Sequence, residues 1–81
     1  MSLSSPIVCA VNATTPFSAK GVSRFIAVTA GTITITSAEG NVVLNAYPVT
    51  AGSWHELNMF VSTTGGTITT AGGAGGTATV C

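Results

Sequence analysis

Charged side chains are scarce in this sequence. Its 81 residues include two basic and two acidic side chains, no aspartate, and a formal net charge of zero. Only 5% of the residues are charged, against roughly 25% in an ordinary soluble domain. Nucleic-acid binding depends on clustered lysine and arginine. Because Lys20 and Arg24 are the only basic residues in the sequence, a nucleic-acid partner is not expected. A monomer with so little charge has little to keep its copies apart, so we expect partners to cover much of its surface.

Groups for catalysis or metal binding are equally few. Glu39 and Glu56 fall in a predicted turn and a predicted strand, and they can act as an acid–base pair only if the fold joins them. His55 precedes Glu56, but neighbours on a strand point to opposite faces. Two cysteines and one histidine do not complete a closed zinc site. We therefore expect a protein that is not an enzyme and has no cofactor or metal.

The two cysteines, Cys9 and Cys81, lie near opposite ends of the sequence. A disulfide between them would close nearly the whole chain into a loop. A reducing cytoplasm disfavours that bond, and a free cysteine packs as a small apolar side chain. We expect free thiols.

Long apolar runs are also missing. No run approaches the roughly 20 residues that span a bilayer, and residues 1–6 lack the basic and apolar segments of a signal peptide. The expectation is a protein made in a cytoplasm that does not associate with a membrane.

The clearest pattern present is a hairpin over Gly31–Leu44. Ile33 and Ile35 alternate with threonines, and a period of two predicts a half-buried strand. Ser37–Gly40 supplies the turn, and Val42 begins the return strand. The Thr-x-Thr-x-Thr motif is similar to ice-binding surfaces, but those need many stacked repeats, so we interpret it as an exposed strand surface.

Further strands are expected at 7–11, 22–29, 54–62, 67–70 and 77–81, with residues 22–46 forming a three-stranded meander. Residues 1–6 are interpreted as an N-terminal arm, 12–21 as a turn and loop, and 71–76 as a flexible glycine-rich loop. Glycines 65–76 lack the following helix and lysine of a phosphate-binding loop. The expected fold is one all-β domain over 1–81, a small antiparallel β-sandwich or barrel of six or seven strands.

The strand predicted at 54–62 has two contrasting faces. The face expected in the core carries His55, Leu57, Met59 and Val61. The opposite face combines aromatic and polar groups, as interfaces do, and carries Trp54, Glu56, Asn58 and Phe60. Because large aromatic side chains supply most interface energy, the candidate contact residues are Trp54, Phe60, Tyr47 and Phe25.

Four segments resemble the small all-β head proteins of tailed bacteriophages and phage-like gene transfer agents, in particular the head-decoration (cement) and spike-base group. They are AVNATTP (10–16), FIAVTAGTI (25–33), PVTAGSW (48–54) and MFVSTTG (59–65). A strand that is often rich in arginine in such proteins is HELNM (55–59) here. The resemblance implies a jelly-roll-like module that sits as a symmetric oligomer on the capsid exterior, where it stabilises the shell or seats a fibre.

These observations lead to an expected function as a virion decoration protein. The expected partners are copies of itself in a homotrimer, the major capsid protein and, where one is attached, a head fibre. The alternatives are a pentameric spike base at a capsid vertex, and a soluble carbohydrate- or receptor-binding module in which Trp54 and Tyr47 line an exposed cleft. The oligomeric state distinguishes the binding module from the virion protein.

Overall fold

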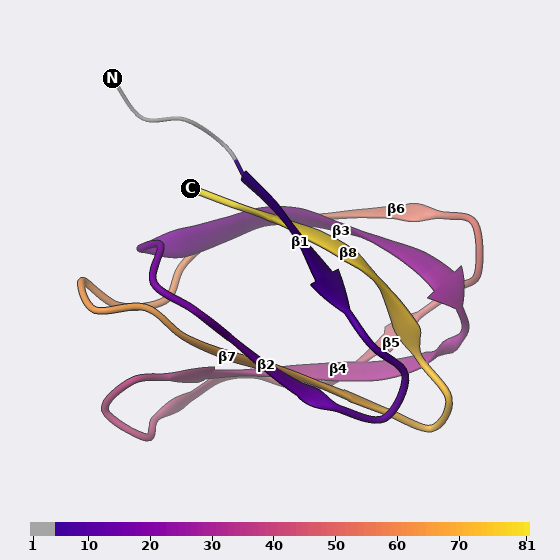
Figure 1. The fold of residues 1–81 in the computed structure, drawn as a ribbon, viewed down its shortest axis with the longest axis horizontal. Helices are drawn as coiled ribbons and strands as arrows, with labels where there is room; N and C mark the ends of the chain where they lie inside the picture. Colours follow the sequence, from indigo (N-terminus) through magenta and orange to yellow (C-terminus); the bar gives the residue numbers. More distant parts are fainter. Residues whose placement is uncertain (1–4) are drawn as a thin grey trace.

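The computed structural model describes residues 5–81, which form eight β-strands and no helix (Figure 1). The all-β expectation is confirmed, but the expected count of six or seven strands is wrong. The strands are β1 (Ser5–Cys9), β2 (Thr14–Phe17), β3 (Gly21–Thr29), β4 (Gly31–Ser37), β5 (Val42–Val49), β6 (Trp54–Phe60), β7 (Gly66–Ala71) and β8 (Gly75–Val80). No helix in this part of the chain is long and apolar enough to cross a membrane.

The strand that the sequence pattern did not predict is β2, which lies within the expected turn and loop. It pairs with β7 alone, at the edge of its sheet. Pro16 lies in this strand, and an edge strand accepts proline because one side of its backbone makes no ladder hydrogen bonds. Pro6 in β1 and Pro48 in β5 also lie in edge strands. Proline therefore marks edges in this fold and does not exclude strands.

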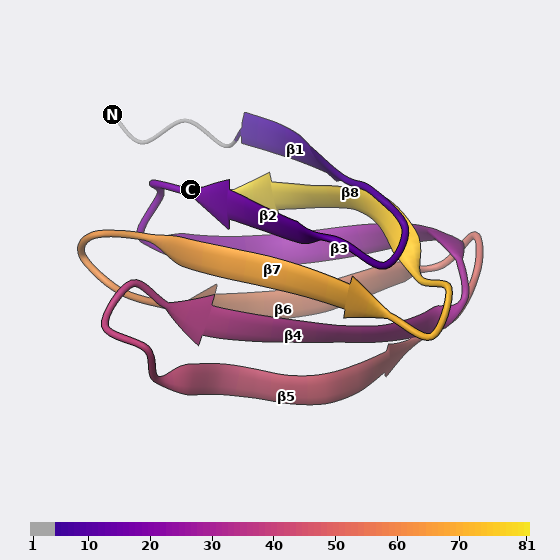
Figure 2. The same ribbon diagram turned by 60° about the horizontal axis from the view of Figure 1, so that its bottom comes forward.

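The strands form two antiparallel sheets, each of four strands in the described chain. Sheet A has the order β1-β8-β3-β6, and sheet B has the order β2-β7-β4-β5. Figures 1 and 2 show the two sheets as layers that face one another. The N-terminal and C-terminal strands, β1 and β8, lie side by side in sheet A.

The three-stranded meander expected over 22–46 does not form. The β4–β5 hairpin is present, but β3 belongs to sheet A and β4 to sheet B. The chain passes between the sheets at Ala30-Gly31. A Cβ atom at Gly31 would collide with the backbone of Ala71 and with Ala74, so glycine permits this close corner.

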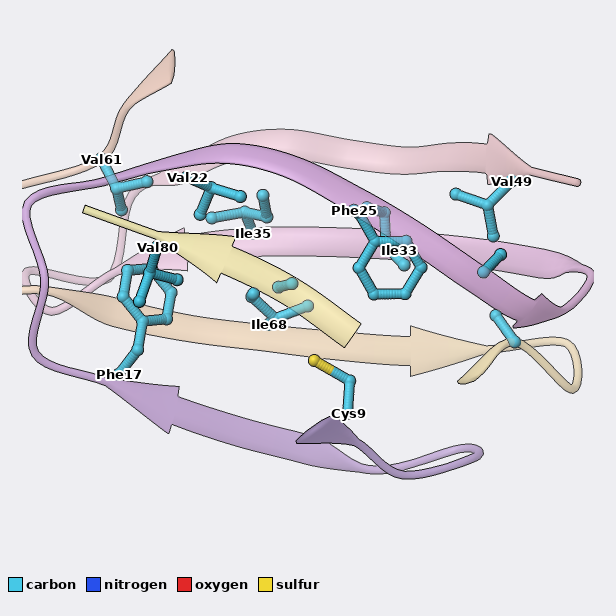
Figure 3. Close-up of a cluster of buried hydrophobic side chains, with 13 residues drawn as sticks. Cys9, Phe17, Val22, Phe25, Ile33, Ile35, Val49, Val61, Ile68 and Val80 are labelled. Atoms are coloured by element: carbon cyan, nitrogen blue, oxygen red, sulfur yellow. The ribbon is translucent and has the colours of Figure 1, made fainter. Parts of the chain in front are cut away.

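A single cluster of buried side chains fills the space between the sheets (Figure 3). Phe25 from sheet A and Ile35 and Ile68 from sheet B have no exposed surface. The alternation of β4 is confirmed, because Ile33 and Ile35 are buried while the threonines between them are partly exposed. Each sheet thus has one inner and one outer face.

Half of the segment expected to be a flexible glycine-rich loop, residues 71–76, belongs to the sheets. Ala71 ends β7, while Gly75 and Gly76 begin β8 and are buried. A Cβ atom at Gly76 would collide with the carbonyl oxygen of Ile26. The connecting turn is short and contains the positive-φ residues Gly72 and Gly73. These glycines therefore allow close packing, contrary to the expected role as a flexible link.

Part of the expected N-terminal arm is also strand. Ser5 and Pro6 open β1 and pair with Val80 and Thr79 of β8. Residues 1–4 of that predicted arm lie outside the described residues.

Candidate functional site

The outward-pointing side of sheet A, called here the sheet A face, is the apolar surface of the molecule. Within residues 5–81, six large hydrophobic side chains are at least half exposed: Val8 (77%), Val28 (71%), Phe60 (64%), Val42 (57%), Trp54 (54%) and Val11 (52%). Four of them lie on strands of sheet A, and Val11 lies two residues after the end of β1. Of the six, only Val42 lies on sheet B. Concentrated exposure of this kind marks an interaction surface.

The strand register arranges the sheet A face in rows that cross all four strands. In one row Val8 lies opposite Thr77, Thr77 opposite Ile26, and Ile26 opposite Trp54. A neighbouring row consists of Pro6, Thr79, Arg24 and Glu56. The row that contains Trp54 has no charged residue, and in the other row Arg24 and Glu56 balance each other.

The Trp54 ring is contacted by an arginine on the neighbouring strand of the same sheet. The guanidinium carbon of Arg24 lies 4.7 Å from the centroid of the Trp54 ring. A cation–π contact of this kind contributes about 0.5–1 kcal/mol at an exposed site. It favours one orientation of the indole ring before any partner binds, which lowers the entropy cost of binding.

Two hollows adjoin the sheet A face. The first, the valine hollow, has a volume of about 240 Å³, and Val8, Val11, Val28 and the backbone of Gly75 and Gly76 contribute to its lining. The second is about 330 Å³ and lies at the other end of the sheet, where it is lined in part by Lys20, Phe60 and Cys81. Neither lining includes Trp54 or Tyr47.

The structure divides the four predicted contact residues into three environments. Trp54 and Phe60 are exposed on β6, on the side that the alternation predicts. Phe25 is fully buried in the core and has no surface to offer to a partner. Tyr47 is half-buried and packs edge-on against His55, with ring centroids 5.9 Å apart. His55 faces inward from β6, so Tyr47 and Trp54 do not line a common cleft.

The outward side of sheet B, called here the sheet B face, has a different chemistry. Thr14, Thr69 and Thr34 are neighbours across three strands, and Thr67 lies opposite Thr36. The Thr14 and Thr69 hydroxyls share a hydrogen bond of 3.2 Å. The four strands of sheet B contain no charged residue. Sequence reasoning found only the β4 threonines of this surface, because the other strands become neighbours only in the fold.

The two glutamate carboxylates, Glu39 and Glu56, lie in different parts of the fold. The Glu39 carboxylate accepts hydrogen bonds from the hydroxyls of Ser62 (2.9 and 3.0 Å) and Thr64 (2.9 Å), and these bonds lower the pKa of Glu39. They join the β4–β5 turn to the β6–β7 turn, while Glu56 points outward from β6. Within residues 5–81 no group of three or more histidine, cysteine, aspartate or glutamate side chains could hold a metal ion.

Both cysteines are free thiols. Cys9 lies opposite Gly76 at one end of β8, whereas Cys81 follows the other end. Five residues of strand separate the two positions by roughly 16 Å, whereas disulfides need Cα atoms within about 7 Å. Cys9 is buried, and burial raises the pKa of its thiol.

No family model, curated protein or solved structure matches the chain. The surface and the fold of the chain itself are therefore the basis for inferring its function.

Proposed function

We propose that this chain is a structural virion protein that decorates the outside of a bacteriophage head. In this role it forms a symmetric oligomer, with a trimer favoured, and stabilises the shell by binding the major capsid protein. The observation that carries the proposal is the sheet A face, where exposed aromatic and valine side chains gather on a chain with four charged residues. Such a surface favours permanent assembly over free diffusion.

The strand order supports the proposal. Two facing sheets with the orders β1-β8-β3-β6 and β2-β7-β4-β5 fit a jelly roll, in which eight strands form two sheets. Jelly rolls are common in viral capsid proteins and also occur in lectins. A fold does not define a function, so the strand order supports the proposal only together with the sheet A face.

The edge strands of both sheets are poorly suited to pairing with another chain, which favours assembly through the faces of the sheets. Three of the four edge strands contain a proline, and the fourth, β6, has Asn58 at a positive φ of 46° where its register shifts. Prolines and bulges at edges block open-ended strand pairing. A chain protected in this way can associate into a closed oligomer without forming fibres.

Sedimentation and shell binding test this proposal. We expect the purified chain to sediment at three times the monomer mass and to co-sediment with empty tailed-phage heads stripped of their own decoration protein. A mass of five copies would instead favour a spike base at a capsid vertex. A monomer that ignores phage heads would contradict the proposal, and if it bound immobilised glycans it would favour the carbohydrate-binding alternative.

A variant pair locates the contact surface. Trp54→Ala should lower the oligomer mass while circular dichroism shows unchanged strand content, because the side chain is exposed and outside the core. Val42→Ala removes a similarly exposed side chain from the sheet B face and should leave the oligomer intact. Equal effects of both changes would count against the sheet A face.

A further inference from the structure

A ring of three or more copies places a strict demand on its subunit. Each copy must contact its two neighbours through two different surfaces, because a single self-complementary patch closes a dimer. A chain that forms such a ring must therefore carry one surface that projects and another that receives it, and the two must not overlap.

The projecting surface is Trp54. It lies on the edge strand β6, its side chain is 54% exposed, and the Arg24 stack holds it in place. Tryptophan and arginine are the residue types most often found at energetic centres of interfaces. Glu56, opposite Arg24 in the register, balances the arginine charge, so the local surface carries no net charge to repel a neutral partner.

The receiving surface is the valine hollow. Val8 lies on β1 at the opposite edge of sheet A, three strand spacings or roughly 14 Å from β6, whereas Val28 lies on β3, the strand that pairs with β6, two residues from the Ile26 that lies opposite Trp54. The hollow has apolar walls because Val8 and Val28 expose most of their side chains, and the Val11 side chain packs closely against Gly75, where a Cβ atom would collide with it. No charged residue lines it. A flat apolar ring is the kind of group that such a hollow accommodates.

We infer that the Trp54 indole of one copy docks into the valine hollow of the next copy, in a head-to-tail contact that closes the ring. The inference rests on the proposed function, since it specifies the contact by which the decoration protein assembles. Two interfaces of standard size, at roughly 800 Å² per partner, would cover about two-fifths of the 4247 Å² that the chain exposes. That coverage accounts for a surface with so few charges.

Two variants break the contact from opposite sides. Trp54→Ala removes the projecting ring and leaves the hollow intact. Val8→Glu places a charge in the hollow at the edge strand farthest from β6 and leaves Trp54 intact. Both side chains are exposed, so each variant should retain the unfolding midpoint of the parent chain to within a small shift. Each variant alone should sediment as a monomer.

Mixing the two variants gives the decisive result. The Trp54→Ala copy offers a hollow and the Val8→Glu copy offers a tryptophan, so a head-to-tail contact predicts dimers that grow no further. Because the chain has one tryptophan, all indole fluorescence in the mixture comes from the Val8→Glu copy. Its emission should move to shorter wavelength as Trp54→Ala is added, since docking removes the ring from water.

A matched control and two contrary outcomes complete the test. Val42→Glu puts the same charge at an exposed valine of the sheet B face and should leave the ring intact. A mixture that stays monomeric while the parent chain forms rings, or a Val42→Glu variant that dissociates equally, would overturn the contact. Phage-head binding separates the two proposals: a monomer that still binds heads overturns the ring alone, whereas a ring that ignores heads overturns the decoration function alone.

Discussion

The two outer faces of this molecule differ although the same strand periodicity produces them. On sheet A the outward positions carry Trp54, Phe60, Val8 and Val28, together with a balanced Arg24 and Glu56. On sheet B the corresponding positions carry threonines, whose methyl groups are small and whose hydroxyls interact with water or with each other. Both faces are nearly free of net charge, so charge does not distinguish them. Side-chain size and polarity do, and they make sheet A the adhesive side.

The inner faces, in contrast, are alike. Both supply fully buried aromatic or branched side chains to one cluster, and both include a glycine at which neighbouring backbone approaches closely. The chain therefore folds around a shared core, and the difference between its two sides is confined to positions that are not needed for folding. This separation lets the outer faces be altered without unfolding the protein.

The largest effect is expected on the shared inner side. Phe25→Ala should lower the free energy of unfolding by about 3–5 kcal/mol, because it removes a fully buried ring and leaves a cavity. Val28→Ala, three residues along the same strand but 71% exposed, should change it by about 0.5 kcal/mol or less. Urea unfolding followed by circular dichroism measures both. A comparable loss in the two variants would mean that the outer face also contributes to folding.

The second prediction is that the close backbone packing at one glycine in each sheet contributes equally to stability. A Cβ atom at Gly76 would collide with the Ile26 carbonyl oxygen, and one at Gly66 with that of Thr36. Alanine at either position should cost about 1–3 kcal/mol through backbone displacement. Unfolding free energies of the two variants should therefore be similar. If only one were destabilised, the sheets would differ inside as well as outside.

Sequence periodicity was a good guide to which residues lie on the same face of a strand. It was a poor guide to which strands belong to the same sheet. The alternation of Ile33 and Ile35 and that of β6 were both found from the sequence, and so was the exposure of Trp54 and Phe60. The sequence did not predict which strands pair with β3. The short connection at Ala30 was interpreted as a hairpin turn, but in the fold it is a corner between the two sheets.

The candidate site was only partly accessible to the same reasoning. Phe25 was chosen as a contact residue because it is a large aromatic side chain. Since β3 has apolar residues at both parities, the pattern did not reveal which parity faces the core. The valine hollow had no sequence signal at all. Val8, Val28 and Gly75 come from three strands distant in sequence, and only the register of β8 between β1 and β3 brings them together.

A smaller effect on stability is expected from a substitution on the sheet B face, and it tests whether that face also contacts other copies. The Thr34 hydroxyl accepts a hydrogen bond of 3.1 Å from the backbone amide of Ala46, at the bulge of edge strand β5. Thr34→Val keeps the shape of the side chain and should cost about 1 kcal/mol in unfolding free energy. Thr36→Val, two residues along the same face, should cost less. Neither change should alter the oligomer mass, and a change in mass would show that the sheet B face also makes contacts between copies.

The smallest effect is expected at the turns, where a carboxylate joins the ends of the two sheets. Because hydrogen bonds from Ser62 and Thr64 lower the pKa of Glu39, its contribution to stability is fully present above the ordinary value of 4.5 and is lost as the pH falls through the lowered folded value. Glu39→Gln should therefore reduce the unfolding midpoint at neutral pH and make stability less dependent on pH below 4.5. Glu56→Gln, outside this cluster, is the matched control for loss of one negative charge. If both variants gave the same pH profile, general charge balance would explain the effect and the contacts of Glu39 would not.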